Sequence, residues 1–365
     1  MGFAYRIEER PEEIITYRDA LWRTMHDALA RDPNVIIMGQ GVDDHKGIFG
    51  STTGLAETFG RERVFDVPLA EDGMTGVALG AALGGLYPIQ THIRCDFALL
   101  AINQLVNMVA KYRYMFGGRF RVPMLVRTVI GRSWGQGAQH SQSPQALFAH
   151  VPGLTVVLPS SADSILETYG TLISRRQVPV VSLEHRLLYD VAFRIPVPAL
   201  EWPQAPLGSI LRRRGRHVTV VATSILVLEA LRAAEHLSQA AGIEVEVIDL
   251  HCASHPDREM ILASVARTGR LLVADTSWCA YGVAAEICGL VCEHDPSALR
   301  APVVTIGMAA APCPTAKTLE DLYYPSLHRL TDEIAVLARG RAKHGVQLPA
   351  EASMADVYKK FKGPF

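Results

Sequence analysis

Glu71 is the first residue whose type and setting indicate chemistry. It follows the apolar run Val64–Val67 and precedes Asp72 and Gly73, so it lies near the carboxyl end of an expected strand, where open α/β sheets place their ligands. Desolvation by apolar neighbours disfavours the charged form of a carboxyl, which makes Glu71 a candidate acid/base group. A structural alternative stays open, because Glu71 or Asp72 would serve equally well as a cap for the free N–H groups that begin a helix.

A second candidate site is the glycine-rich loop at residues 131–143, which carries the imidazole of His140 together with Gln139 and Trp134. The loop follows an apolar strand pattern, and loops beside rigid strands often carry functional residues. The Gly-Lys-Ser/Thr ending of a phosphate-binding loop is absent, and Gly-x-Gly alone is a weak signal. A lone histidine is more often structural than catalytic, so the residues alone leave both interpretations of His140 open.

The cysteines offer no metal site. They stand at positions 95, 252, 279, 288, 292 and 313, with no Cys-x-x-Cys pair and no zinc-like spacing. We therefore expect no metal bound by this chain alone, and reduced thiols, which are the rule in the cytoplasm. The charged first thirteen residues argue against a signal peptide. The uncharged run Gly73–Ile93 contains several glycines and Pro88, which favours a packed helix and a strand over a membrane span.

Charge and composition exclude two classes of protein. The 36 Lys and Arg residues against 37 Asp and Glu give a net charge of −1, so the chain has no basic field for binding nucleic acid. A hydrophobic content of 49% with so little net charge excludes an intrinsically disordered chain. Charged residues make up only 20%, below the usual value of about 25%, so the sequence is short of surface-type residues.

Apolar, β-branched runs alternate with helix-length segments, a pattern that indicates parallel sheets in an α/β protein. The expected strands are Val35–Met38, Val64–Val67, Tyr87–Ile93, Met124–Ile130, Thr155–Leu158, Val178–Leu183, Val218–Ala222, Glu244–Leu250, Leu271–Ala274 and Val303–Ile306. The expected helices include Tyr17–Ala30, Met74–Leu83, Ala98–Met115, Ser164–Ser174, Leu226–Ala241, Arg258–Ala266 and Val283–Cys292.

A proline-rich stretch separates two groups of strands. Four prolines fall between positions 196 and 206, and regular pairing does not run through that density of proline. We therefore expect a first domain at 1–195, a linker at 196–212, a second domain at 213–340 and a C-terminal tail at 341–365. The basic run Arg212–Arg216 is more simply a solvated turn than a dock for an acidic partner.

The order of several short motifs resembles one family. These motifs are Glu71-x-Gly, Asp96-Phe97 with Gln104, Gln139-His140-Ser141-Gln142, Pro152-Gly153-Leu154 and Pro179-Val180-Val181 with Glu184. The sequence is similar to the β subunit of the thiamine-diphosphate-dependent decarboxylating component of 2-oxo acid dehydrogenase complexes. In the second domain the similarity is looser and rests mainly on Gly282–Ile287. The resemblance implies two α/β domains, each with a mainly parallel sheet flanked by helices: a pyrimidine-binding domain and a transketolase C-terminal-like domain.

The resemblance assigns roles to the candidate residues at the cofactor. Glu71 matches the glutamate that hydrogen-bonds the aminopyrimidine ring of thiamine diphosphate and exchanges a proton with it. Phe97 matches the aromatic residue that stacks on this ring, although an ordinary core phenylalanine is the alternative, and Ile93 is expected beside the cofactor. His140 matches a histidine that stabilises charge developing on the substrate or intermediate.

The resemblance also implies a partner. The family holds the diphosphate and Mg²⁺ with a Gly-Asp-Gly motif and a later asparagine, and this sequence contains no Gly-Asp-Gly. We therefore expect thiamine diphosphate to be shared with an α subunit that holds Mg²⁺, in an α2β2 heterotetramer. The shortage of charged residues fits this assembly, because obligate interfaces are apolar.

Three departures from the family pattern bear on substrate, complex and ion. Arg94-Cys95-Asp96 stands where the family often has Thr-Phe-Asn, so Arg94, with Gln139 and Trp134, is expected to line a substrate pocket of altered preference. The segment 251–255 replaces an Arg-Thr-x-Arg-Pro sequence, which weakens the expectation of docking to a lipoyl acyltransferase. Arg175 stands in a potassium site of some relatives, and we predict that its guanidinium replaces the ion.

The sequence therefore predicts the β subunit of an enzyme that decarboxylates a 2-oxo acid and transfers the acyl unit to a lipoyl group. Two alternatives stay open. One is a split transketolase-like carboligase with an aldehyde acceptor, and the other is a non-catalytic scaffold subunit. The sequence names neither the 2-oxo acid nor the pathway.

Overall fold

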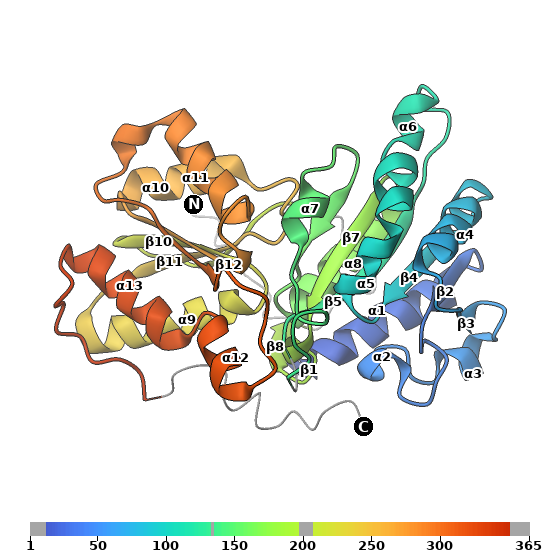
Figure 1. The fold of residues 1–365 in the computed structure, drawn as a ribbon, viewed down its shortest axis with the longest axis horizontal. Helices are drawn as coiled ribbons and strands as arrows, with labels where there is room; N and C mark the ends of the chain where they lie inside the picture. The colour runs from blue at the N-terminus through green and yellow to red at the C-terminus, as the bar shows by residue number, and fades with distance from the viewer. Residues whose placement is uncertain (1–11, 133–134, 197–206, 351–365) are drawn as a thin grey trace, which may run out of the picture.

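Two large sheets, each covered by helices on both faces, and a two-stranded ribbon make up the described part of the molecule (Figure 1). The computed structural model describes residues 12–132, 135–196 and 207–350. The first sheet has six strands, all parallel, in the order β3-β2-β4-β5-β7-β6. Their bounds are β2 Val35–Gly39, β3 Val64–Asp66, β4 Tyr87–His92, β5 Met124–Ile130, β6 Thr155–Val157 and β7 Pro179–His185. The parallel sheet predicted for the first domain is confirmed.

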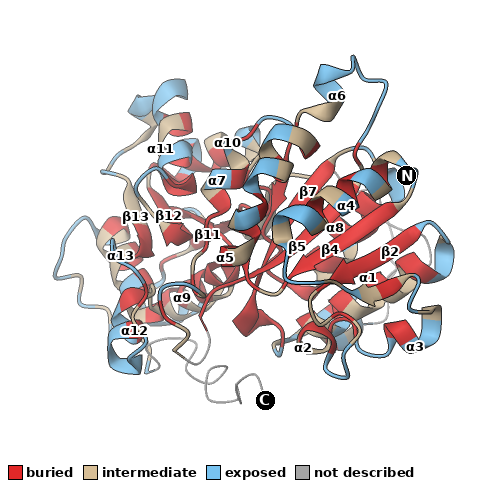
Figure 2. Ribbon diagram, turned by 45° about the vertical axis from the view of Figure 1, so that its right-hand side comes forward, coloured by how far each residue is buried: buried red, intermediate tan, exposed pale blue. Residues whose placement is uncertain are grey.

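The side chains of each strand in the first sheet point alternately to the two faces, and each face packs against a different set of helices. Ile37, Leu125 and Val180 share a core with α1 (Tyr17–Arg31) and α8 (Ala162–Arg175). Met38, Val126 and Val181, one residue further on, share the other core with α4 (Glu71–Leu83). Successive side chains of a strand point to opposite faces, so strands buried on both sides read as continuous apolar runs. Figure 2 shows these strands fully buried beneath helices with exposed outer surfaces.

The second sheet has five strands in the order β13-β12-β10-β11-β9. Their bounds are β9 Ile210–Arg213, β10 Val218–Ala222, β11 Val245–Asp249, β12 Leu271–Trp278 and β13 Val304–Met308. All pairs are parallel except β9, which runs antiparallel to β11 at the edge. Helices α9 (Ile225–Ala241) and α13 (Leu327–Arg339) cover one face, and α10 (Arg258–Thr268) and α11 (Val283–His294) cover the other.

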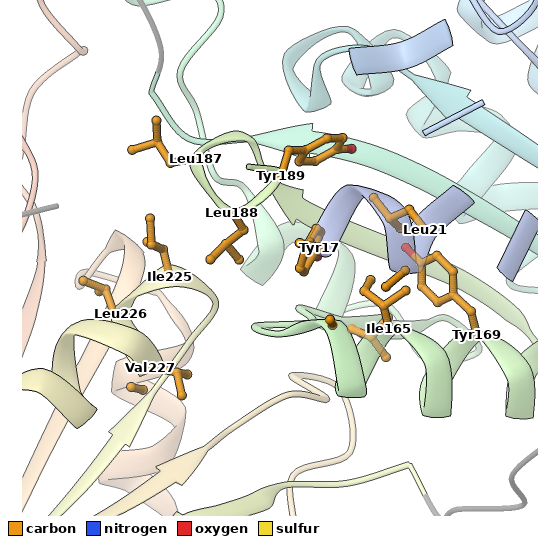
Figure 3. Packing of buried hydrophobic residues seen from close by; sticks show 14 of the residues in the cluster. Tyr17, Leu21, Ile165, Tyr169, Leu187, Leu188, Tyr189, Ile225, Leu226 and Val227 are labelled. Atoms are coloured by element: carbon orange, nitrogen blue, oxygen red, sulfur yellow. The ribbon is translucent and has the colours of Figure 1, made fainter. Parts of the chain in front are cut away.

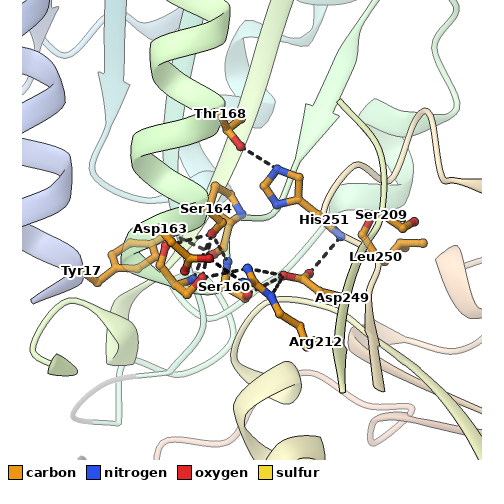
Figure 4. Close-up of polar contacts among 12 residues, drawn as sticks. Tyr17, Ser160, Asp163, Ser164, Thr168, Ser209, Arg212, Asp249, Leu250 and His251 are labelled. Atoms are coloured by element: carbon orange, nitrogen blue, oxygen red, sulfur yellow. Dashed lines mark hydrogen bonds and ion pairs between the residues drawn. The ribbon is translucent and has the colours of Figure 1, made fainter. Parts of the chain in front are cut away.

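The basic run after the proline-rich stretch corrects one expectation. Arg212 lies in β9 and not in a solvated turn, and its side chain is largely buried between the domains. It donates to Asp163 at the start of α8 (2.6 Å) and to Asp249 at the end of β11 (3.2 Å). Figure 4 shows this network, in which Ser160 also donates to Asp249. Arg212, the first residue of the basic run, therefore pairs with acidic residues on both sides of the interface between the domains.

The two domains also share apolar and backbone contacts. Leu187 and Leu188 of the first domain belong to the same buried cluster as Ile225 and Leu226 of the second (Figure 3). The backbone N–H of Leu158 donates to the carbonyl of His251 at 2.7 Å. A ribbon of β1 (Glu12–Thr16) and β8 (Ala192–Pro196) pairs the two ends of the first domain. The relative placement of the domains is therefore fixed by continuous packing.

One long helix expected from the sequence is broken in the structure. Instead of a single helix over 98–115, the chain forms α5 (Cys95–Ala98), a 3₁₀ turn (Leu99–Ala101), a π-helical turn (Gln104–Val109) and α6 (Tyr112–Met115). No glycine or proline lies in this stretch to mark the changes of pitch. The π turn carries Gln104, whose amide donates to Asp72 of α4 at 3.4 Å. The break thus lies beside the helix that carries Glu71.

Candidate active site

Glu71, Phe97 and His140 lie at the carboxyl edge of the first sheet, where β2, β4 and β5 end. Glu71 is the first residue of α4, after the non-helical Ala70, and it is half-buried. Its Oε1 accepts a hydrogen bond from the Gln40 amide at 3.3 Å, and Gln40 directly follows β2. The apolar enclosure expected around this carboxyl is therefore incomplete within the described chain.

His92 is a neighbour of Glu71 that the sequence reasoning missed. It ends β4 and is 3% exposed. Burial lowers the pKa of His92 to about 4, against a smaller opposing effect of the Glu71 charge, so its imidazole is neutral near pH 7. Its Nε2 has no hydrogen-bond partner among the described residues. The only sequence signal was its position at a strand end, one residue before Ile93.

Phe97 and His140 come together from different elements. Their ring centroids lie 5.1 Å apart with an interplanar angle of 82°, an edge-to-face contact that aromatic rings favour. Phe97 lies in α5 and His140 in the loop after β5, and both are half-buried. The partial exposure of the Phe97 ring argues against an ordinary core residue.

Asp96 joins these two elements. Its Oδ1 accepts from the backbone N–H of Gln142 at 3.2 Å and from the Gln142 side-chain amide at 2.9 Å. Burial raises the pKa of Asp96, against the hydrogen bonds from Gln142. The carboxyl thus ties the His140 loop to the turn that carries Phe97, a role that the family comparison of Asp96 with asparagine did not reveal.

The remaining predicted residues lie apart from this contact. Arg94 is 3% exposed and donates to the Gly131 carbonyl at 3.1 Å and to the Gln136 side chain, so it supports the base of the loop. Gln139 is exposed and Ile93 is half-buried at the end of β4. Trp134 lies outside the described residues. The roles of these four residues at the cofactor or substrate stay predictions.

The residues present fit the pyrimidine half of thiamine diphosphate. A carboxyl that accepts a hydrogen bond, a half-buried aromatic ring and a buried imidazole nitrogen without a partner among the described residues are the groups that would meet a polar aromatic ring. The part of the chain that the structure describes contains no group of three or more His, Cys, Asp or Glu residues arranged to hold a metal ion.

The predicted ion replacement by Arg175 stays a prediction. Arg175 is exposed in the last turn of α8. The next residue, Arg176, adopts a left-handed conformation (φ 45°); it pairs with Asp32, and its guanidinium lies 5.1 Å from the ring centroid of Tyr87. The neighbouring guanidinium therefore joins α8 to the end of α1.

Comparison with known families matches both halves of this architecture. Residues 13–191 match the transketolase pyrimidine-binding domain, and residues 208–330 match the transketolase C-terminal domain. The fold also resembles a solved structure described as a split gene transketolase, inactive beta4 tetramer, with a TM-score of 0.68 over 88% of this chain and 97% of that one at 22% identity. The fold and site define a transketolase-like protein of two domains.

Sequence relatives narrow this class. The chain is 41% identical over 315 residues to the pyruvate dehydrogenase E1 component subunit beta-1, mitochondrial, of Arabidopsis thaliana, covering 86% of each chain. It is 39% identical to the mouse mitochondrial subunit beta, covering 86% of this chain and 88% of that one, and 38% identical to the Rickettsia felis subunit beta, covering 86% and 94%. The chain belongs to the family of β subunits of the decarboxylating component of 2-oxo acid dehydrogenases.

None of the helices in the described ranges has the length and apolar character needed to cross a membrane.

Proposed function

We propose that this chain is the β subunit of a two-subunit enzyme that uses thiamine diphosphate to decarboxylate a 2-oxo acid. The observation that carries the proposal is the placement of Glu71, Phe97 and His140 at one sheet edge, in a chain similar to pyruvate dehydrogenase β subunits over most of its length. Pyruvate, which those relatives' names contain, is the first substrate to assay.

The chain's own residues supply proton transfer, orientation and charge stabilisation. When bound, thiamine diphosphate supplies a nucleophilic carbon that no side chain provides. Glu71 would hold a proton at the aminopyrimidine ring, with Gln40 orienting its Oε1. Phe97 would present its exposed face to the same ring. His140, fixed against Phe97, would stabilise negative charge that develops on the substrate.

The surface around Glu71 supports a partner that completes the site. Leu69, just before α4, is 83% exposed, and Leu100, in the 3₁₀ turn that packs against α4, is 63% exposed. Val77 of α4 is also exposed. Exposed apolar groups next to a half-open carboxyl fit an interface that is desolvated on assembly. We assign it to an α subunit that brings the diphosphate site and Mg²⁺, within an α2β2 heterotetramer.

The acceptor of the acyl unit is proposed to be the lipoyl group of an acyltransferase. An aldehyde acceptor, as in a split transketolase-like carboligase, is the alternative outcome. Supplying lipoyl domain or a sugar aldehyde to the assembled α and β chains, with the same 2-oxo acid, separates the two. Acyl transfer to the lipoyl domain supports the proposal, and carbon–carbon bond formation with the aldehyde alone replaces it.

Thiamine diphosphate binding tests the shared site. Titration calorimetry with thiamine diphosphate and Mg²⁺ should give stoichiometric binding to the assembled α and β chains and little binding to either chain alone. Glu71→Ala in the assembled pair should weaken this binding, whereas Glu57→Ala, an exposed change in α3 (Leu55–Phe59), should not. Tight stoichiometric binding by the isolated β chain would overturn the shared site.

A reducing compartment fits the thiols of the chain, and we propose the cytoplasm. All six cysteines are free, and three are buried, whereas oxidising compartments favour disulfides. The Arabidopsis and mouse relatives are named as mitochondrial, and the Rickettsia relative is not. Fractionation of the native cell with an antibody to the chain distinguishes the two compartments.

A further inference from the structure

The loop that carries His140 is held from outside its own domain. Tyr324 follows α12 (Lys317–Tyr323) of the second domain, and its hydroxyl donates to the carbonyl of Ser141 at 3.4 Å. At the other end of the loop, Arg132 pairs with Asp321 of α12 at 2.9 Å. The Arg132 guanidinium also lies 5.1 Å from the centre of the Tyr324 ring. One short helix thus contacts both ends of the loop.

Two glycines bring the middle of the loop directly onto the second domain. Gly135 and Gly137 have φ values of 73° and 72°, which favour glycine over other residues. A Cβ on Gly135 would lie 2.6 Å from the Thr315 carbonyl oxygen, and one on Gly137 would lie 2.6 Å from the Thr315 methyl group. Both the backbone conformation and the space therefore require these glycines.

His140 makes a backbone contact within the described part of the loop. The backbone N–H of His140 donates to the Gly137 carbonyl at 3.4 Å, which is long for a hydrogen bond. On the first-domain side, Asp96 holds Gln142 by two hydrogen bonds. The position of His140 accordingly depends on side-chain contacts from both domains.

The second-domain contact surface is rigidly built. Met308, Cys313 and Tyr323 form a small buried cluster, with Trp278 and Tyr324 packed against it. The Tyr323 and Tyr324 rings lie 4.9 Å apart, edge to face. A packed aromatic cluster with little rotamer freedom can hold a loop without being displaced by it.

We propose that Arg132 and Tyr324 are positioning residues that hold His140 in place by clamping residues 135–141, together with Arg132 itself, onto α12 and Thr315. The catalytic part of this inference rests on the function proposed above for His140. The clamp joins the histidine to a domain that contributes none of the predicted catalytic side chains. It also gives a role to Arg132, which lies in the loop next to the buried Arg94.

Hydrogen exchange tests the clamp without any assumption about activity. In the full-length chain assembled with its natural partner, Arg132→Gln and Asp321→Asn should each speed amide exchange in residues 135–143 by about tenfold, with β5 unchanged. Tyr324→Phe keeps the ring and should act more weakly. Lys317→Ala is the control, because Lys317 is exposed and pairs with the other oxygen of Asp321. Unchanged exchange in both Arg132→Gln and Asp321→Asn overturns the clamp.

Kinetics of the same assembly test whether the clamp acts through His140. Arg132→Gln should lower kcat for decarboxylation about tenfold with KM changed less than about threefold. In a His140→Ala background the same change should have little further effect, because residues that act as a unit are not additive. Full additivity of the two losses contradicts positioning of His140. If the wild-type pair decarboxylates no 2-oxo acid, the proposed function fails, and the exchange measurement still decides the clamp.

Discussion

At the scale of single residues, the proposed function depends most on Glu71. Its carboxyl stands at the start of α4, half-open and bonded to Gln40, which is a poor arrangement for a purely structural cap. Ala70, at the N-cap position of α4, has no side chain that could cap the helix. The charge of Glu71 acts on the nearby His92, whose pKa it raises against the effect of burial. A half-open carboxyl of this kind suits proton exchange with a ligand.

Replacing Glu71 by alanine should abolish turnover while leaving the fold intact. We expect Glu71→Ala to lower kcat by at least about 100-fold, since Glu71 is the carboxyl assigned to proton transfer at the cofactor ring. Melting temperature and α–β assembly should stay close to wild type. Steady-state decarboxylation and size-exclusion chromatography check both points, and activity within a few-fold of wild type would reject the assigned role.

Asp96 offers a matched pair of changes. Asp96→Asn keeps an oxygen that accepts from Gln142 and should retain activity within about threefold, since the buried site tolerates the neutral group. Asp96→Ala removes both bonds to Gln142 and should lower kcat about tenfold through displacement of the loop. Equal activities for the two variants would show that the bonds to Gln142 do not matter.

The sequence offered candidates for the reacting residues but not for the residues that contact them. Glu71 and His140 stood out because their types and positions match chemistry. Contacts between segments far apart in the chain involve four residues that the sequence analysis missed: Gln40, His92, Arg132 and Asp321. No local sequence pattern predicts such contacts. Arg94 was expected in a substrate pocket because it departs from the family pattern; its hydrogen bonds to the Gly131 carbonyl and Gln136 could not be read from the sequence, and the pocket role stays a prediction.

At the scale of elements, a buried ion pair joins two strands behind the site. Arg127 of β5 and Glu184 of β7 form a bidentate pair at 2.7 and 2.9 Å with both side chains fully buried. The hydroxyls of Tyr169 and Tyr189 also donate to the carboxylate, and both rings lie in the core drawn in Figure 3. The pair lies in the middle of β5, the strand after which the His140 loop begins.

Breaking this pair should destabilise the first domain strongly. Glu184→Gln leaves the Arg127 charge buried without its counter-ion and should lower the free energy of unfolding by about 3–5 kcal/mol. The double change Arg127→Met with Glu184→Gln should recover part of that loss. Urea unfolding followed by circular dichroism measures both variants. A single-variant loss below about 1 kcal/mol would contradict the importance of the pair.

Strands were easier to predict from the sequence than helices and edges. All ten expected strands exist, because runs buried on both faces give a continuous apolar signal. The strands β1, β8 and β9 were not expected, since edge and ribbon strands are partly polar. The π-helical turn at Gln104–Val109 was invisible because its residues suit an ordinary helix, and its pitch follows from packing on α4.

At the scale of the whole molecule, a buried carboxyl lies where the domains meet. Asp275, at 0% exposure, accepts from Gln145 of α7 (Gln145–Ala149) in the first domain at 2.6 Å and from Thr223 in the second at 2.9 Å. Burial raises the pKa of Asp275 to about 6, against these hydrogen bonds. The ionised carboxylate is therefore less favourable in the folded chain than in the unfolded one.

The sign of this shift predicts a pH dependence of stability. Between the unfolded pKa near 4 and the folded value of about 6, the native state binds the extra proton, so this group lowers stability as pH rises. Asp275→Asn removes the titration. Its stability relative to wild type should increase by about 2 kcal/mol between pH 4.5 and pH 7. Urea unfolding at both pH values measures this, and a pH-independent difference would contradict the shift.

The low content of charged residues is also a property of the whole molecule. Charged residues make up 20% of the chain, and several large apolar side chains, including Leu69, Leu100 and Tyr114, stay exposed. A single chain with this surface would be prone to association. The heterotetramer proposed above would account for both features and would complete a site that is half-open in this chain.

Release of carbon dioxide from a 2-oxo acid labelled at its carboxyl tests whether this chain is the β subunit of a thiamine-diphosphate-dependent decarboxylase. The assay uses this chain assembled with its natural α subunit, thiamine diphosphate and Mg²⁺, starting with pyruvate. We predict release that requires both chains and the cofactor and that falls at least about 100-fold in Glu71→Ala. If the wild-type assembly releases no carbon dioxide from any of a panel of 2-oxo acids, or if Glu71→Ala releases as much as wild type, the proposed function is wrong.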